Sequence, residues 1–283
     1  MPRLTARLTN WLYKQLMYSK VIRLTIGMLV CACVAMAQEL YVNTEPASNM
    51  AANSLGIRLE NQGYFKPDFK NRSILELMYG VNRNLMVHST LYMSDYYQSK
   101  QRFEGVSAYA KYRLYSADSV QRHFRLAAFA KVASIRNPIP NQEIALEGDN
   151  SGVQGGLVAT QLLHKLALSG SVSYLRAFQN RGGYEPLTRN SVGYTLSAGY
   201  LMFPKQYTNY EQTNINLYAE LLGKTNPGKG QSYLDIAPAV QFIFNSVLRV
   251  DLSYRTPLTN RMVRNTQNMY LVRVEYNLFN LFK

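Results

Sequence analysis

Cysteine is nearly missing from this sequence of 283 residues: there are two, Cys31 and Cys33, and both lie close to the N-terminus. Once the N-terminal segment has been removed, the chain would hold no thiol, which excludes disulfides and a cysteine nucleophile. Histidine is also scarce, and His88, His123 and His164 do not follow a metal-ligand spacing. The sequence therefore predicts no metal site and no cofactor.

Catalytic motifs are missing as well. There is no G-x-S-x-G nucleophile motif. The glycine-rich stretch Gly152 to Gly156 is not followed by the helix pattern that a phosphate loop needs. We therefore predict that the protein is not an enzyme, and we assign no catalytic residue. A serine and a histidine brought together across strands, around His88, is the enzymatic alternative that stays open.

Long hydrophobic runs are missing after Ala37, where no apolar stretch reaches the about 20 residues that a transmembrane helix requires. Before that point, basic residues precede the apolar core Leu24 to Val34, and residues 35–37 read Ala-Met-Ala, a small-x-small cleavage site. This order predicts a secretory signal peptide over residues 1–37, cleaved after Ala37. Lipidation at Cys33 and a start at Met17 are alternatives left open.

Positive charge is in excess, with a formal net charge of +14. In an exported protein such a charge favours outer-membrane lipid and lipopolysaccharide as partners, and not nucleic acid. We expect the basic residues of the connecting loops to face outward and meet lipopolysaccharide phosphates. These residues are Lys66, Lys70, Arg72, Lys100, Arg102, Arg181, Arg189, Lys224, Lys229, Arg261 and Arg264. The transported solute and the oligomeric state are not specified by the sequence.

Met269 to Phe282 shows the pattern that the rest of the chain repeats. From Tyr270 nearly every second residue is apolar, while Arg273 and Glu275 fall between them, and this period of two indicates a strand with one apolar and one charged face. The pattern returns from Ser54 onward, with turn residues such as Ser116 to Asp118 between the repetitions. About twelve strands of roughly ten residues result, an even number, as in outer-membrane barrels.

The connections between these predicted strands differ in length from one side to the other. Those after the second, sixth and tenth strands are very short, whereas those after the odd-numbered strands are mostly longer, polar and basic. This sorting is typical of a barrel with both chain ends in the periplasm. A sheet in lipid must also close, because lipid cannot satisfy open strand edges.

The predicted fold class is therefore all-β: a single transmembrane antiparallel β-barrel of about 12 strands in the bacterial outer membrane, preceded by a signal peptide. Residues 1–37 are the signal peptide, residues 38–53 an N-terminal periplasmic or lumenal segment without alternation, and residues 54–283 the barrel.

Charged residues of the strands fall on the face opposite to the apolar one, which we expect to line the lumen. They are Arg58, Glu60, Glu76, Lys111, Arg113, Arg125, Lys131, Glu220, Asp235, Arg249, Asp251, Arg273 and Glu275. Closure brings the first strand beside the last, so Arg and Glu residues of the two can form cross-strand pairs. Two interpretations stay open: a structural network that fills a narrow lumen, and a polar filter along a pathway.

Tyr233 to Phe242, followed by a two-residue turn and Leu248 to Pro257, resembles the end of proteins in the phenol-degradation-pathway outer-membrane group. These are distant relatives of the long-chain fatty-acid transporter porins. The resemblance implies a barrel that passes small hydrophobic molecules and whose N-terminal segment can enter the lumen. Residues Gln38 to Asn53 occupy the position of such a plug.

These observations predict a passive outer-membrane channel for small hydrophobic or amphipathic solutes. The alternative from another class is a structural or assembly barrel with a filled lumen, and an outer-membrane enzyme comes third.

Overall fold

The computed structural model describes residues 41–119, 122–204, 212–265 and 267–280. The predicted signal peptide, residues 1–37, lies outside the described residues. Within the described ranges there is no helix of the length and apolar character needed to cross a membrane.

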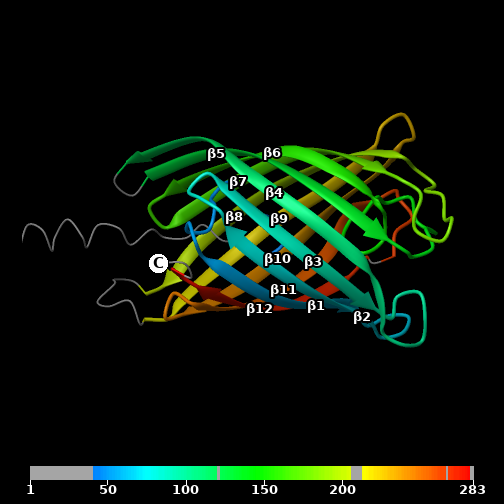
Figure 1. The fold of residues 1–283 in the computed structure, drawn as a ribbon, viewed down its shortest axis with the longest axis horizontal. Coiled ribbons are helices and arrows are strands. Elements are labelled where there is room, and N and C mark those ends of the chain that lie inside the picture. The colour runs from blue at the N-terminus through cyan, green and yellow to red at the C-terminus, as the bar shows by residue number, and fades with distance from the viewer. Residues whose placement is uncertain (1–40, 120–121, 205–211, 266, 281–283) are drawn as a thin grey trace, which may run out of the picture. The chain divides into compact units, whose positions relative to one another are not determined.

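Twelve antiparallel strands close into a barrel, and Figure 1 shows them from the side as tilted arrows. Each strand pairs with its neighbours in sequence, and β1 also pairs with β12, which closes the ring. The strands are β1 (Leu55–Tyr64), β2 (Lys70–Gly80), β3 (Leu85–Ser94), β4 (Arg102–Ser119), β5 (Arg122–Ile135), β6 (Gly152–Leu163), β7 (Leu166–Ala177), β8 (Asn190–Phe203), β9 (Asn214–Asn226), β10 (Gln231–Phe244), β11 (Leu248–Asn260) and β12 (Met269–Leu278).

The apolar face of each strand points out of the barrel. Every strand exposes at least one large apolar side chain on this face, for example Leu59, Leu77, Leu91, Val106, Val132, Leu157, Val172, Leu196, Leu217, Phe244, Leu252 and Val274. An outer surface of this kind is stable in lipid, whereas the closed ring leaves no strand edge unpaired. The predicted all-β transmembrane barrel of twelve strands is confirmed.

The two ends of the barrel differ. Residues 81–84, 164–165 and 245–247 make short turns at one end, and residues 136–151 and 178–189 make long connections at the other. The predicted turn at Ser116 to Asp118 is wrong, because β4 continues through these residues and pairs with β5. Turn-forming residue types are overridden there by the backbone pairing of the two neighbouring strands.

Two segments that belong to no strand lie inside the barrel. Residues 41–53 enter from the end that carries the short turns, and their Tyr41 and Val42 pack on inward side chains such as Leu162 and Tyr218. Residues 136–151, the connection from β5 to β6, fold in from the opposite end. Ile144 and Leu146 of this loop are buried in an apolar cluster with residues of β2, β3, β5 and β7. We call them the N-terminal segment and the inner loop.

Candidate functional site

Charged side chains of β1 and β12 face one another across the closure of the barrel. Arg58 lies opposite Glu275 in the strand register, and its Nε donates to a Glu275 carboxylate oxygen at 2.8 Å. Arg58 also donates to Glu76 of β2 at 2.7 Å. Two residues further along, Arg273 lies opposite Glu60 and donates to it. The inner wall of β1, β2 and β12 is therefore a ladder of opposite charges.

The ladder continues into β11, where the side chains of Arg249 and Asp251 are nearly inaccessible to solvent. Arg249 lies 3.0 Å from Asp251 and 3.2 Å from Glu275. Arg273 approaches Asp251 at 3.5 Å. Because a buried charge is costly unless it is paired, these contacts fix the side chains to one another.

Glu220 of β9 holds the beginning of the N-terminal segment. One carboxylate oxygen accepts from the backbone N–H of Val42 at 3.1 Å and that of Asn43 at 2.8 Å, and also from the Asn43 side chain at 3.1 Å. The other oxygen accepts from the hydroxyls of Thr44 at 2.7 Å and Ser197 at 3.3 Å. Glu220 is fully buried, and each of these hydrogen-bond donors is uncharged.

Lysine and arginine side chains hold the next part of the same segment from the other side of the lumen. Lys111 of β4 donates to the backbone carbonyls of Pro46 at 2.6 Å and Ser48 at 2.8 Å. It also lies 3.4 Å from the Glu45 carboxylate. Arg125 of β5 donates to the Ser48 hydroxyl at 2.8 Å. The N-terminal segment thus crosses the lumen between β9 and β4, anchored at both sides.

The inner loop is anchored in the same way by basic residues of the wall. Lys131 pairs with Glu147 at 2.7 Å, and Lys224 pairs with Glu143 at 3.1 Å. Arg72 donates to Asp149 at 2.6 Å. These pairs tie the loop to β2, β5 and β9, and so to well-separated parts of the ring.

The pKa values of the carboxyl groups in the inner loop are shifted in different directions. Burial by itself raises the pKa of Glu147, but Lys131 and Lys224 outweigh it and hold that pKa at about 2. Burial also opposes ionisation of Glu143, whose pKa is nevertheless lowered by Lys224 and Arg255. At Asp149 burial dominates over Arg72, and the pKa is raised. Burial thus opposes ionisation of all three carboxyl groups, and the neighbouring basic side chains outweigh it at Glu147 and Glu143.

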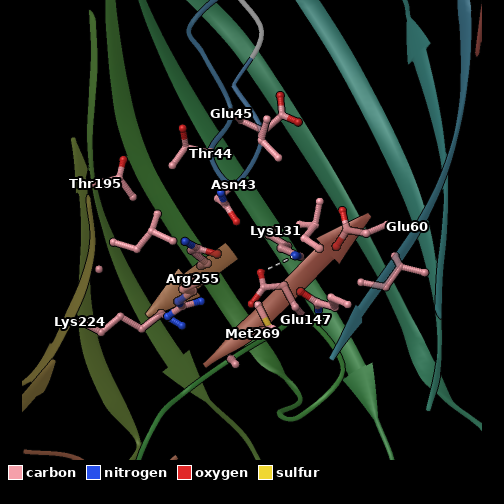
Figure 2. Close-up of a pocket in the computed structure, with 18 of the residues that line it drawn as sticks. Asn43, Thr44, Glu45, Glu60, Lys131, Glu147, Thr195, Lys224, Arg255 and Met269 are labelled. Carbon is pink, nitrogen blue, oxygen red and sulfur yellow. Dashed lines mark hydrogen bonds and ion pairs between the residues drawn. The ribbon is translucent and has the colours of Figure 1, made fainter. Parts of the chain in front are cut away.

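A cavity of about 340 Å³ lies in the lumen between the N-terminal segment and the inner loop. Figure 2 shows Asn43, Thr44 and Glu45 on one side of it and the Lys131–Glu147 pair in its centre. Charges of both signs line the cavity, together with apolar residues such as Ile74, Leu222 and Leu271. It can hold a small solute that has both polar and apolar parts.

Glu45, Glu76 and His88 lie close enough together to be considered as metal ligands. However, Arg58 donates to Glu45 at 3.2 Å and to Glu76 at 2.7 Å, and Lys111 lies beside Glu45. A cation would have to displace a guanidinium and an ammonium group that already neutralise the carboxylates. The arrangement is better described as part of the ion-paired network.

The predicted lumen-lining residues all lie on inward-facing positions of the strands. Asp235, for example, pairs with Arg255 at 2.5 Å and Arg264 at 2.6 Å, and Arg113 lies half-buried on the same face as Lys111. Several further charged residues belong to this network but were not among the predicted lumen-lining residues. They are Glu45, Arg72, Glu104, Glu143, Glu147, Asp149, Lys224, Arg255 and Arg264.

For three of these residues, Arg72, Lys224 and Arg264, the prediction that they face outward to lipopolysaccharide is wrong. Arg72 is 3% exposed and pairs with Glu104. Lys224 points into the lumen, and Arg264 is buried against Asp235. The physical reason is strand parity: Arg72 shares the face of Glu76, and Lys224 that of Glu220, so both belong to the inner wall.

No family model and no curated protein matches the chain. Among solved structures, the chain is similar to the COG4313 outer membrane channel from Pseudomonas putida F1, with a TM-score of 0.51 and 13% identity over 84% of this chain and 100% of that one. A KdgM porin matches with a TM-score of 0.44 and 17% identity over 79% and 98% of the two chains. The first of these likenesses supports the fold, a closed antiparallel barrel.

Proposed function

We propose that this protein is a passive channel of the bacterial outer membrane for small solutes. The observation that carries the proposal is the cavity inside the closed barrel, bounded by two inward-folded segments and surrounded by an apolar outer face. A barrel of this kind sits in lipid, and the space within it is the only part of its cross-section that a polar group can enter at low cost.

Amphipathic solutes are the class that the cavity suits best. Its ion pairs offer matched charges, while Ile74, Leu222 and Leu271 offer apolar surface within the same space. The resemblance of the last strands to the phenol-degradation-pathway group supports the same class, and we propose that relationship on this basis.

A structural barrel with a filled lumen is the second candidate. It is favoured by the anchoring of both inner segments, because Lys111 and Glu220 hold one of them and Lys131 and Lys224 the other. We do not propose an enzyme, since His88 faces Glu76 within the ion-paired network at 3.4 Å.

The test compares the intact mature protein with a variant lacking residues 38–53, in planar bilayers and in solute-uptake liposomes. We expect the deletion to raise ion conductance and the uptake of aromatic or amphipathic solutes, because it removes one boundary of the cavity. Heat-dependent migration on a gel reports that both proteins are folded. If both are folded and both are silent, the channel is refuted and the structural barrel takes its place.

We further propose that the end with long connections faces the cell exterior and meets lipopolysaccharide. Of the eleven basic residues predicted to face outward, six are exposed: Lys66, Lys100, Arg181, Arg189, Lys229 and Arg261. Lys70 and Arg102 are partly buried in local hydrogen bonds. The outward set is thus smaller than the sequence suggested, and it excludes Arg72, Lys224 and Arg264.

A further inference from the structure

One sector of the lumen wall carries no charge. On the inner face of β6, β7 and β8 the cavity is lined by Gln154, Ser171, Ser173, Gly193 and Thr195. The single charged residue of these three strands, Arg176, is exposed on the outer face. In the strand order β7 stands opposite β1, so the neutral sector faces the charged ladder of β1, β2 and β12 across the cavity.

The side chains of the neutral sector are short and bond to one another. The hydroxyls of Ser171 and Thr195 lie 2.6 Å apart, and Gln154 donates to Ser173 at 3.0 Å. A hydroxyl has one donor and two acceptor positions, so each retains capacity for a further hydrogen bond after the mutual one. In Figure 2 Thr195 borders the cavity on the side away from Glu60.

The opposite sector differs in both size and chemistry. Its Arg and Glu side chains are long, extend into the lumen and are engaged with one another, as in Arg58 with Glu76 and Arg273 with Glu60. These pairs occupy space and neutralise each other's charge. The cavity is therefore bounded by engaged charges on one side and by the small residues of β6 to β8 on the other.

We propose that solutes pass along this neutral sector, and that it selects uncharged solutes bearing hydroxyl or carbonyl groups. The inference rests on the proposed channel function and specifies its substrate class. A solute hydroxyl or carbonyl can exchange its bonds to water for bonds to Ser171, Ser173 and Thr195. A charged group would lose hydration without meeting an unpaired counter-charge, which is costly.

The sequence offers a clean way to test the path, because residues 38–283 contain no cysteine. Single variants S171C and T195C place a thiol on the neutral sector, and Q62C places one on β1, in the charged sector of the same cavity. Each protein is reconstituted into liposomes and treated with a neutral aromatic methanethiosulfonate. Uptake of erythritol, a neutral polyol, and of lactate, an anion, is then measured before and after labelling.

We expect the unlabelled protein to admit erythritol about tenfold faster than lactate, the factor that one unmatched polar interaction typically gives. Labelling should slow erythritol uptake through S171C and T195C strongly, and through Q62C only slightly. Equal slowing at both sectors, or equal uptake of erythritol and lactate, would overturn the inference while leaving the channel intact.

Thiol reaction rates in the same preparation separate the two proposals. If no variant admits either solute, and the protein lacking residues 38–53 is silent as well, the channel fails. In that case, a faster reaction of the S171C thiol than of the Q62C thiol would still support the neutral sector as the water-accessible wall of the cavity. The reverse order of reaction rates would overturn it.

Discussion

Replacing Glu220 by glutamine should release the N-terminal segment. The carboxylate accepts hydrogen bonds from Val42, Asn43 and Thr44 of that segment, and from Ser197 of the wall. Glutamine removes the charge, and it turns one acceptor oxygen into an NH₂ group that faces hydroxyls. The change is nearly isosteric, so packing around the site is retained.

The size of the effect follows from the donors involved. A hydrogen bond to a charged group contributes about 1.5 to 3 kcal/mol, against about 1 kcal/mol for a neutral one. The glutamine weakens the hydrogen bonds donated by the backbone N–H groups of Val42 and Asn43 and by the side chains of Asn43 and Thr44. Together, this weakening should cost roughly 3 kcal/mol. Since 1.4 kcal/mol corresponds to a factor of ten, the docked state should become about 100-fold less favoured relative to the undocked state.

Hydrogen exchange at the Val42 and Asn43 amides measures this directly, because both N–H groups are bonded to Glu220 in the docked segment. We expect their exchange to accelerate by about 100-fold, in step with the docking equilibrium. Glu104→Gln is the matched control: Glu104 is also a fully buried lumenal carboxylate, but it bonds to Arg72 and Asn137 and not to the segment. Unchanged exchange in Glu220→Gln, or equal acceleration in both variants, would refute the assignment of Glu220 as the anchor.

Three further predictions concern the inner loop and the outer rim. The inner loop should stay protected from hydrogen exchange above about pH 4.5 and lose protection as the pH falls toward 2. The pKa of Glu147 is depressed to about 2, so the stability that its ion pair contributes is lost only as the pH falls below the pKa of this group in the unfolded chain. Loss of protection already between pH 8 and 6 would contradict this. Lys224→Met should speed proteolysis within residues 136–151 about tenfold by removing the bonds to Glu143 and Ile144, whereas Lys229→Met on the exposed turn of the same hairpin should not. Exchanging Lys66, Lys100, Arg181 and Lys229 together for glutamine should weaken lipopolysaccharide association, most strongly at low salt, while Arg83→Gln at the opposite rim should leave it unchanged.

Strand periodicity was sufficient to predict the barrel from the sequence. A strand with an apolar side chain at every second position can lie in lipid only as part of a closed sheet. The number of strands follows from the turn residues between the repeats. The same parity also placed charged residues such as Arg58 and Glu275 on the inner wall. It could have placed Arg72 and Lys224 there as well, but both lie near strand ends, where a basic residue resembles a loop residue.

The contents of the lumen could not be predicted in this way. Residues 136–151 have no periodicity, and their inward fold depends on partners such as Arg72, Lys131 and Lys224 on three different strands. Contacts so distant in sequence leave no local pattern. The asymmetry between the neutral and the charged sector arises similarly, since it requires knowing which strands face one another across the ring.

The charge order along β1, β11 and β12 also specifies how the barrel must close. In the native pairing Arg58 meets Glu275 and Glu60 meets Arg273. A slip of two residues keeps every side chain on its proper face, yet it sets Arg58 against Arg273 in one direction or Glu60 against Glu275 in the other. The same slip between β11 and β12 opposes Arg249 to Arg273, or Asp251 to Glu275. Because like charges directly across a strand pair are destabilising, and a slip of one residue would turn the charges toward lipid, the neighbouring misaligned closures are each disfavoured during assembly. The order of charges on these strands thus favours the correct alignment of the first strand with the last.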